Sequence, residues 1–225
     1  EFDFSDLSMT AQSFQDYKIA QDGNIYAIGF EGNTGSYSIN VSKISQSGNL
    51  IWSKNYDGGG NDFGQGIEVL STGELFISGF SNSFGNGNDD LFLTKLDANG
   101  NELWTNFYGG NLDESTFYSA RNFSVNEIDN KVFLFSNTTS FGGTDSDPFL
   151  VVSDLENNFD CNTVSANWTA TTQTPVVTNI TATVNNLGSM SNSAYSVNSF
   201  LSTLDTICNT LPDTIGTNDI CYRAH

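Results

Sequence analysis

Short apolar runs recur along the first part of the chain, and each run is apolar at both odd and even positions. The string GNIYAIGF begins at Gly23, GELFISGF begins at Gly73, and a weaker copy, NKVFLFSN, begins at Asn130. A strand that is apolar on both faces lies between two layers, so these runs predict sheets that stack on one another. No window carries apolar residues at helical spacing for more than two turns, which favours an all-β fold.

A second pattern follows each apolar run and predicts a hairpin. It reads VSKISQSGNLIWSKNY from Val41 and LTKLDANGNELWTNFY from Leu93, and a third copy, LVVSDLENNFD from Leu150, lacks the Trp. The central Ser, Asn and Gly residues accept the positive φ that tight hairpins require. Trp52 and Trp104 occupy matching places in the second strand of the hairpin. We expect both to pack between sheets, and a ligand-binding role is the alternative.

The repeats have the length of β-propeller blades. The spacing is 50 residues from Gly23 to Gly73 and 52 residues from Val41 to Leu93. A period near 50 with four strands per unit matches a propeller blade, whereas a solenoid usually has a shorter period. The sequence therefore predicts three β-propeller-like four-stranded blades over residues 1–160. Because rings need about 4–8 blades, we expect the remaining blades to come from upstream sequence or from neighbouring chains.

The repeats resemble the bacterial β-propeller repeats called SBBP repeats. The stretch that matches best is GNDDLFLTKLDANGNELWTNFYGG, from Gly87 to Gly110, and residues 16–160 match more loosely. The resemblance implies a large secreted or cell-surface protein, of the kind found in gliding, type IX-secreting bacteria. It implies no particular activity, because propellers carry many functions.

Residues 161–225 differ in composition, being dominated by Thr, Ser, Asn and Val. Alternation at Ile180, Ala182 and Val184 predicts strands with a polar outer face, and hence a Thr/Asn-rich β module that continues beyond the chain. A disordered stalk is the alternative, since Ser/Thr-rich tracts often stay unfolded. In the resembling family, a Cys-flanked stretch of this kind often follows the last repeat.

The three cysteines all lie in this second segment. Their spacing and the presence of one histidine, His225, make a zinc site improbable, and an extracellular disulfide fits better. We expect Cys161 to pair with Cys208, which bracket the Thr-rich stretch, and pairing of Cys208 with Cys221 is the alternative. Thr206 and Thr214 lie in two DTI strings that are similar to the O-glycosylation acceptor motif of type IX-secreting bacteria.

The net charge is −19, from 26 acidic and 7 basic residues, so a nucleic-acid partner is excluded by repulsion of its phosphates. Solubility explains such a charge, and Ca²⁺ binding is the sharper alternative. Asp97, Asn99 and Asn101 alternate like the first ligands of a Ca²⁺ loop. The string lacks the glycine and the glutamate that such a loop needs at its sixth and twelfth positions, so a plain hairpin turn is favoured. Apart from this weak Ca²⁺ match, no cofactor is expected.

Further acidic pairs fall in predicted loops and would form a cation site only if they converge: Asp89–Asp90, Asp113–Glu114, and Asp145 with Asp147. No nucleophile–base–acid set can be assembled, because the one histidine is the last residue. No apolar run approaches the roughly 20 residues of a membrane span.

The function expected from the sequence is a non-catalytic extracellular surface module, adhesive or filament-forming, within a larger or processed protein. Its partners would be other subunits or the rest of the polypeptide. A carbohydrate-binding propeller is the alternative, and an enzyme-associated propeller comes last.

Overall fold

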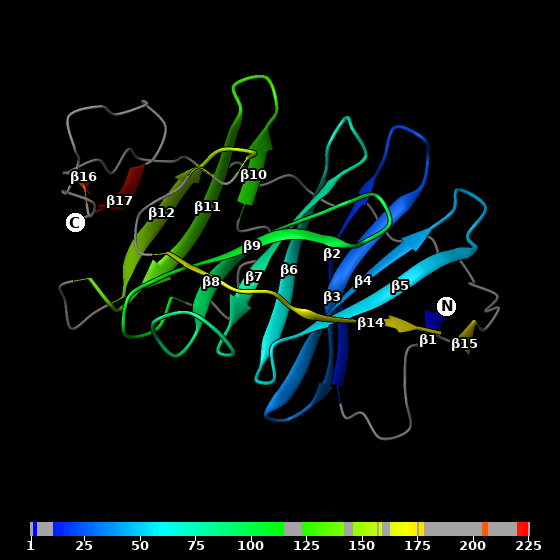
Figure 1. Cartoon of the computed structure of the whole chain (residues 1–225), viewed down its shortest axis with the longest axis horizontal. Coiled ribbons are helices and arrows are strands. Elements are labelled where there is room, and N and C mark those ends of the chain that lie inside the picture. The colour runs from blue at the N-terminus through cyan, green and yellow to red at the C-terminus, as the bar shows by residue number, and fades with distance from the viewer. Residues whose placement is uncertain are drawn as a thin grey trace, which may run out of the picture.

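The computed structural model describes residues 2–3, 11–114, 123–141, 146–156, 158, 163–174, 176–177, 204–206 and 220–224. Within these ranges the chain forms strands and turns but no helix, so the expected all-β class is confirmed. None of the described residues therefore belongs to a helix long and apolar enough to cross a membrane. Most strands belong to three five-stranded antiparallel sheets, which stand in a row in Figure 1.

The first sheet takes four strands that follow one another along the chain and a fifth from much later in the sequence. Its order is β14-β5-β4-β3-β2. The strands are β2 (Ala11–Ile19), β3 (Ile25–Asn33), β4 (Ser36–Ile44), β5 (Leu50–Asp57) and β14 (Thr169–Gln173). The two recurring sequence patterns thus form β3 and the β4–β5 hairpin, as the repeats predict.

The second sheet repeats this arrangement, with the order β13-β9-β8-β7-β6. Its strands are β6 (Asp62–Val69), β7 (Leu75–Ser81), β8 (Asp90–Leu96), β9 (Glu102–Tyr108) and β13 (Thr163–Ser165). Strand β6 is formed by the Gly-rich string that separates one hairpin from the next apolar run. Each of the first two repeats therefore contributes four consecutive antiparallel strands.

The third sheet, with the order β10-β11-β12-β17-β16, is assembled differently. Its strands are β10 (Phe123–Asn126), β11 (Lys131–Thr138), β12 (Asp147–Ser153), β17 (Ile220–Ala224) and β16 (Leu204–Thr206). The third repeat lacks the Trp-containing strand of the hairpin, and β17 takes that strand's place beside β12. A separate two-stranded ladder joins β1 (Phe2–Asp3) to β15 (Val176–Val177).

Irregularities of the ladders recur at matching positions, which shows that the first two sheets are copies of one unit. The pairing of β2 with β3 skips Gln15, and that of β6 with β7 skips Gln65, 50 residues later. In the hairpins the pairing skips Ile51 and Leu103. A bulge adds one residue to a strand and increases its local twist, so the two sheets are bent at the same places.

The sheets pack face to face through two apolar clusters. Ile28 and Ile39 of the first sheet meet Ile77 and Phe92 of the second in one cluster. On the opposite face of the second sheet, Phe76 belongs to a cluster that includes residues of the third sheet. We call the packed interface between the first and second sheets the first joint, and that between the second and third sheets the second joint. Adjacent residues on β7 face different joints, which is the environment predicted for strands that are apolar on both faces.

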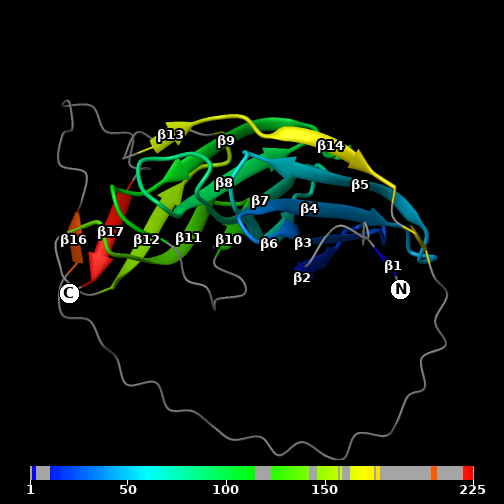
Figure 2. The same ribbon diagram turned by 90° about the horizontal axis from the view of Figure 1, so that it is seen from below.

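Residues 163–173, which we call the strap, run along the outer edges of two sheets. Strand β13 pairs with β9 of the second sheet, and β14 pairs with β5 of the first. Figure 2 shows the strap, in yellow, crossing from one sheet to the other. The beginning of the Thr/Asn-rich segment thus extends the repeat sheets, while the predicted domain boundary at residue 160 stays a prediction.

Candidate functional site

Polar side chains are concentrated where one sheet leads into the next, and the first such place is the connection from β5 to β6. Asp62, which has no exposed surface, accepts a hydrogen bond from the backbone N–H of Gly58 at 2.7 Å and from Ser83 Oγ at 2.7 Å. Ser81 Oγ also donates to Asp62. The carboxylate therefore ties the Gly-rich connection to the end of β7, and we call this arrangement the clasp.

The clasp recurs in the connection from β9 to β10. Glu114, also fully buried, accepts hydrogen bonds from the N–H of Gly110 at 3.1 Å and from Thr138 Oγ1 at 2.7 Å. Ser140 Oγ accepts the N–H of Leu112, as Ser83 Oγ accepts the N–H of Gly60. The acid, the glycine four residues before it and the hydroxyl groups thus occupy equivalent places in the two copies.

Glycine is required at the clasp because the connection passes directly over side chains. A Cβ on Gly58 would overlap the side chain of Ser83, and a Cβ on Gly110 would overlap that of Ser140. A Cβ on Gly109 would overlap both Asp90 Oδ1 and Glu114 Oε2. Two carboxylates that lie in different predicted loops are therefore brought together over the backbone of one glycine.

The Asp90–Glu114 pair brings together two carboxyl groups that have no exposed surface. Asp90, at the start of β8, has no exposed surface and accepts the N–H of Gly87 at 2.9 Å through Oδ2. Its Oδ1 receives no hydrogen bond from a protein donor. A backbone hydrogen bond keeps the two acids close, since the N–H of Glu114 donates to the carbonyl of Asp89 at 2.7 Å.

Burial, together with the neighbouring Glu114 carboxylate, raises the pKa of Asp90 to about 7. Asp90 therefore keeps its proton over much of the acidic range. Burial also raises the pKa of Asp62, against the opposing effect of its hydrogen bonds to Ser81 and the backbone. The predicted pairs Asp89–Asp90 and Asp113–Glu114 thus converge through one member of each.

Asp97, Asn99 and Asn101 form a hydrogen-bonded turn between β8 and β9. Asp97 Oδ1 accepts the N–H groups of Asn99 and Asn101, both at 2.8 Å, and Oδ2 accepts Asn101 Nδ2 at 2.8 Å. These bonds hold the pKa of Asp97 below its ordinary value, against the opposing effect of desolvation. Asp154 binds Asn158 in the same way after β12. Both oxygens of Asp97 are therefore engaged by the turn itself.

The same turn reaches the first sheet and forms part of the joint. Tyr56 Oη donates to the carbonyl of Gly100 at 2.7 Å, and Lys54 Nζ donates to that carbonyl at 3.1 Å. Lys54 Nζ also donates to Asn101 Oδ1 at 2.9 Å, which occupies the side-chain oxygen of a third predicted ligand. The turn thus acts as a contact between sheets.

Trp52 and Trp104 lie at matching places against aromatic residues of their own sheets. Trp52 packs edge-on against Tyr26 with ring centroids 6.1 Å apart, and Trp104 against Phe76 at 5.6 Å. Each Trp is partly buried against one of the two apolar clusters. These contacts are those expected of packing residues.

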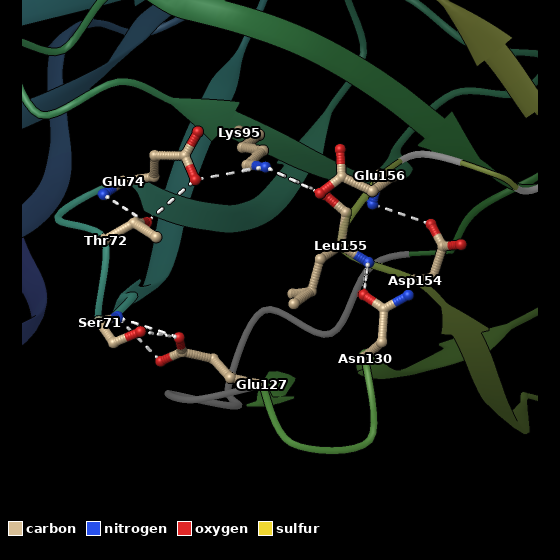
Figure 3. Close-up of polar contacts among 9 residues, drawn as sticks. All are labelled: Ser71, Thr72, Glu74, Lys95, Glu127, Asn130, Asp154, Leu155 and Glu156. Atoms are coloured by element: carbon tan, nitrogen blue, oxygen red, sulfur yellow. Dashed lines mark hydrogen bonds and ion pairs between the residues drawn. The ribbon is translucent and has the colours of Figure 1, made fainter.

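Figure 3 shows a second group of polar contacts between the second and third sheets, made by Lys95 and by turn residues of both sheets. Lys95, only 6% exposed, lies 3.5 Å from Glu74 and 3.7 Å from Glu156, and its Nζ donates to the carbonyl of Leu155 at 3.3 Å. Ser71 Oγ donates to Glu127 at 2.6 Å. A buried cation surrounded by acceptors from two sheets holds these turns in register.

Sequence reasoning missed Trp168, which lies in the strap and is 6% exposed. Its indole Nε1 donates to Thr94 Oγ1 at 2.9 Å, and its ring packs 5.3 Å from those of Phe92 and Phe107. The strap is thereby anchored in the joint between the first and second sheets. The available signal was a lone Trp in a Thr/Ser-rich tract, where a large apolar residue needs a partner.

Several predicted residues receive no side-chain description. Cys161, Cys208, Asp145, Thr214 and His225 lie outside the described residues, so the disulfide, with its alternative, stays a prediction. Cys221 and Thr206 are described only by their backbone, in β17 and β16. Asp147 begins β12 opposite Thr138.

No protein-family description matches the chain, and comparison with curated proteins finds no relative. In the described ranges no three His, Cys, Asp or Glu residues gather as a metal centre would require. The chemistry that the geometry supports at Asp90–Glu114 is proton uptake and release inside a joint, with the protonated carboxyl donating to its neighbour.

Proposed function

We propose that the chain is a non-catalytic structural module of the bacterial cell surface, made of propeller-like blades. The observation that carries the proposal is the repeated clasp. In both copies a buried acid accepts hydrogen bonds from the N–H of a glycine four residues earlier and from a hydroxyl group near the end of β7 or β11. These bonds fix the connection that leads from one sheet to the next. Acidic and hydroxyl side chains, which are catalytic in many enzymes, here hold the three sheets together.

Blade-like packing is supported by the order of the strands. Each of the first two repeats gives four consecutive antiparallel strands, and β6, the first strand of its sheet, contacts β2, β3 and β4 of the sheet before it. Four-stranded antiparallel sheets that follow one another along the chain and pack face to face are typical of propellers.

A structural role is also supported by where the large aromatic residues lie. All three tryptophans of the chain pack on apolar clusters within the array. The tryptophans are thus used for packing, which supports the structural role, while the exposed ring of Tyr17 is the place to test the carbohydrate-binding alternative.

Labelling of intact source cells tests the proposed location. An antibody raised against the chain is expected to stain cells that have not been permeabilised, and brief external protease treatment is expected to remove the signal. A cytoplasmic protein probed in the same samples is the control. Staining that appears only after lysis contradicts the proposal.

Turnover and glycan binding are tested on the purified chain. Chromogenic glycosides and esters should show no hydrolysis above the blank, and a glycan array should show no selective binding. Hydrolysis that is lost in Asp90→Asn would make the buried pair catalytic and the proposal wrong. Selective binding to one glycan class, lost on substitution of the exposed Tyr17, would favour the carbohydrate-binding alternative.

A further inference from the structure

The outer face of the third sheet exposes apolar positions that are covered in the other two sheets. Phe135 on β11 is 52% exposed, whereas its repeat equivalents Ile28 and Ser78 are fully buried. Phe133 on the same strand is partly exposed, whereas its equivalent Phe76 is fully buried. In the first two sheets this face packs against the next sheet. The third sheet therefore carries the apolar face that packs on the next sheet in the first two repeats, but no described sheet lies against it.

The opposite end of the array exposes the complementary half. On β2 of the first sheet, Tyr17 is 59% exposed and Ile19 is 66% exposed. Their repeat equivalents, 50 residues later on β6, are Ile67 and Val69, which pack in the cluster between the first and second sheets. Strand β2 thus exposes apolar residues at the positions where β6 carries the residues that pack on the preceding sheet.

The internal joint shows how two such halves fit. Strand β6 contacts β3 and β4 of the preceding sheet. The strands of the third sheet that correspond to β3 and β4 are β11 and β12, and β11 carries Phe133 and Phe135 on its outer face. A β2 strand facing the third sheet as β6 faces the first would turn Tyr17 toward these aromatic rings. It would lie further out than β6 does, because the exposed Phe14 stands where β6 has Gly64, a position at which even a Cβ would overlap Ile28 and Ile39.

The polar part of the first sheet's outer face does not oppose this contact. Asn40 and Asn55 stand where Phe92 and Phe107 stand in the second sheet, and they are already only 4% and 6% exposed. Asn40 Nδ2 donates to Asn55 Oδ1 at 2.7 Å, and Asn55 donates to Glu31. These bonds lie within the first sheet, so a contact made along β2 leaves them intact.

We propose that two copies of this chain associate head to tail, with β2 of each copy packed on the outer face of the third sheet of the other. The inference rests on the blade-like packing of the proposed function. The described part of each copy supplies three five-stranded sheets, so two copies supply six, which lies within the range of about 4–8 blades that close a ring. A second copy is favoured over an unrelated partner because it covers both exposed ends at once.

Analytical ultracentrifugation of the purified chain over a concentration series tests the proposal. The expected mass is twice that of the 24.4 kDa chain. Phe135→Ser and Tyr17→Ser remove the two halves separately, and each should weaken the dimer about 10- to 100-fold, the range set by losing one large apolar contact. Phe135→Glu is a second variant on the same surface position, and circular dichroism melting confirms that each variant folds.

Ile128→Ser is the matched control, because Ile128 is 96% exposed in the turn between β10 and β11, apart from both contact strands. This variant should remain dimeric. A monomer at every concentration overturns the proposal. Loss of the dimer in Phe135→Ser but not in Tyr17→Ser overturns the head-to-tail arrangement, and an open-ended polymer overturns the ring. A monomer that still labels the cell surface would leave the proposed function standing, so the two failures are distinguishable.

Discussion

Asp90 Oδ1 and Glu114 Oε2 meet directly above the Cα of Gly109, so that a methyl group at this glycine would overlap both carboxylates. One acid begins β8 and the other ends the connection that follows β9. Neither has any exposed surface. The connection between the second and third sheets therefore contains a buried site whose proton uptake should make stability depend on pH.

Asp90→Asn should remove most of that dependence. Because the folded-state pKa of Asp90 is raised from 3.8 to about 7, the folded protein binds more protons than the unfolded chain between these values. Stability from this group is therefore present below about pH 4 and lost as the pH rises to about 7. Melting temperatures measured from pH 4 to 9 should fall less steeply in the variant than in the wild type.

The neighbouring exposed residue provides the control for this experiment. Asp113→Asn removes one negative charge beside Glu114, in the connection that follows β9, but the Asp113 side chain is exposed to solvent. It should reproduce the wild-type pH profile. Equal flattening of the profile in both variants would show that the overall charge, rather than the buried pair, causes the dependence.

Gly58→Ala should destabilise the first clasp by about 1–3 kcal/mol, the usual cost of overpacking. The added methyl group would overlap the side chain of Ser83, whose hydroxyl binds both Asp62 and the N–H of Gly60. Urea unfolding followed by tryptophan fluorescence measures the change. Gly35→Ala is the control for glycine replacement in open space, since no atom lies within 4 Å of its added Cβ and only its φ of 87° carries a cost. A smaller loss in Gly58→Ala than in Gly35→Ala would contradict the clasp.

Trp168→Ala should cost about 3–5 kcal/mol, as expected for removing a buried aromatic side chain. It should also release the strap, because the indole packs edge-on against the rings of Phe92 and Phe107. Limited proteolysis should then cut near residues 163–173 faster than in the wild type. Trp168→Phe keeps the ring contact and loses only the bond to Thr94, so its loss should be smaller. Identical proteolysis of all three proteins would refute the anchoring role.

Tyr56→Phe should cost about 0.5–1.5 kcal/mol, the net value of one hydrogen bond. The lost bond is that from Tyr56 Oη to the carbonyl of Gly100, which also accepts from Lys54 Nζ. Because both donors serve one acceptor, a double-mutant cycle with Lys54→Met should give a coupling energy different from zero. Strict additivity of the two changes would mean that the shared carbonyl does not link them.

The repeats could be predicted from sequence because their patterns are local. The alternation in GNIYAIGF and the Asn-Gly turn beside Trp104 each lie within a few residues, and they place β3, β7 and the hairpins correctly. The pairings of β13, β14 and β17 could not be predicted, because nothing in such short strands specifies which distant sheet edge they join.

The candidate site was predictable only in part, for the same reason. The acidic pairs at Asp89–Asp90 and Asp113–Glu114 were visible in the sequence, but their convergence depends on how the Gly-rich connections fold across a joint. In contrast, the preference for a plain turn at Asp97 could be derived from the missing Ca²⁺-loop residues alone. The bonds from Asn99 and Asn101 to its carboxylate are of the kind that a turn of Asx type makes.

The strap also sets a mechanical limit on the array. Only residues 166–168 separate its β13 ladder on the second sheet from its β14 ladder on the first. Fully stretched, that link reaches no more than about 14 Å. If a pulling force separates the first two sheets, this link becomes fully extended before water can fill the space between them. Further separation then requires the hydrogen bonds of β13 with β9 or of β14 with β5 to break. The third sheet has no described tether of this kind, so under load the second joint should yield first.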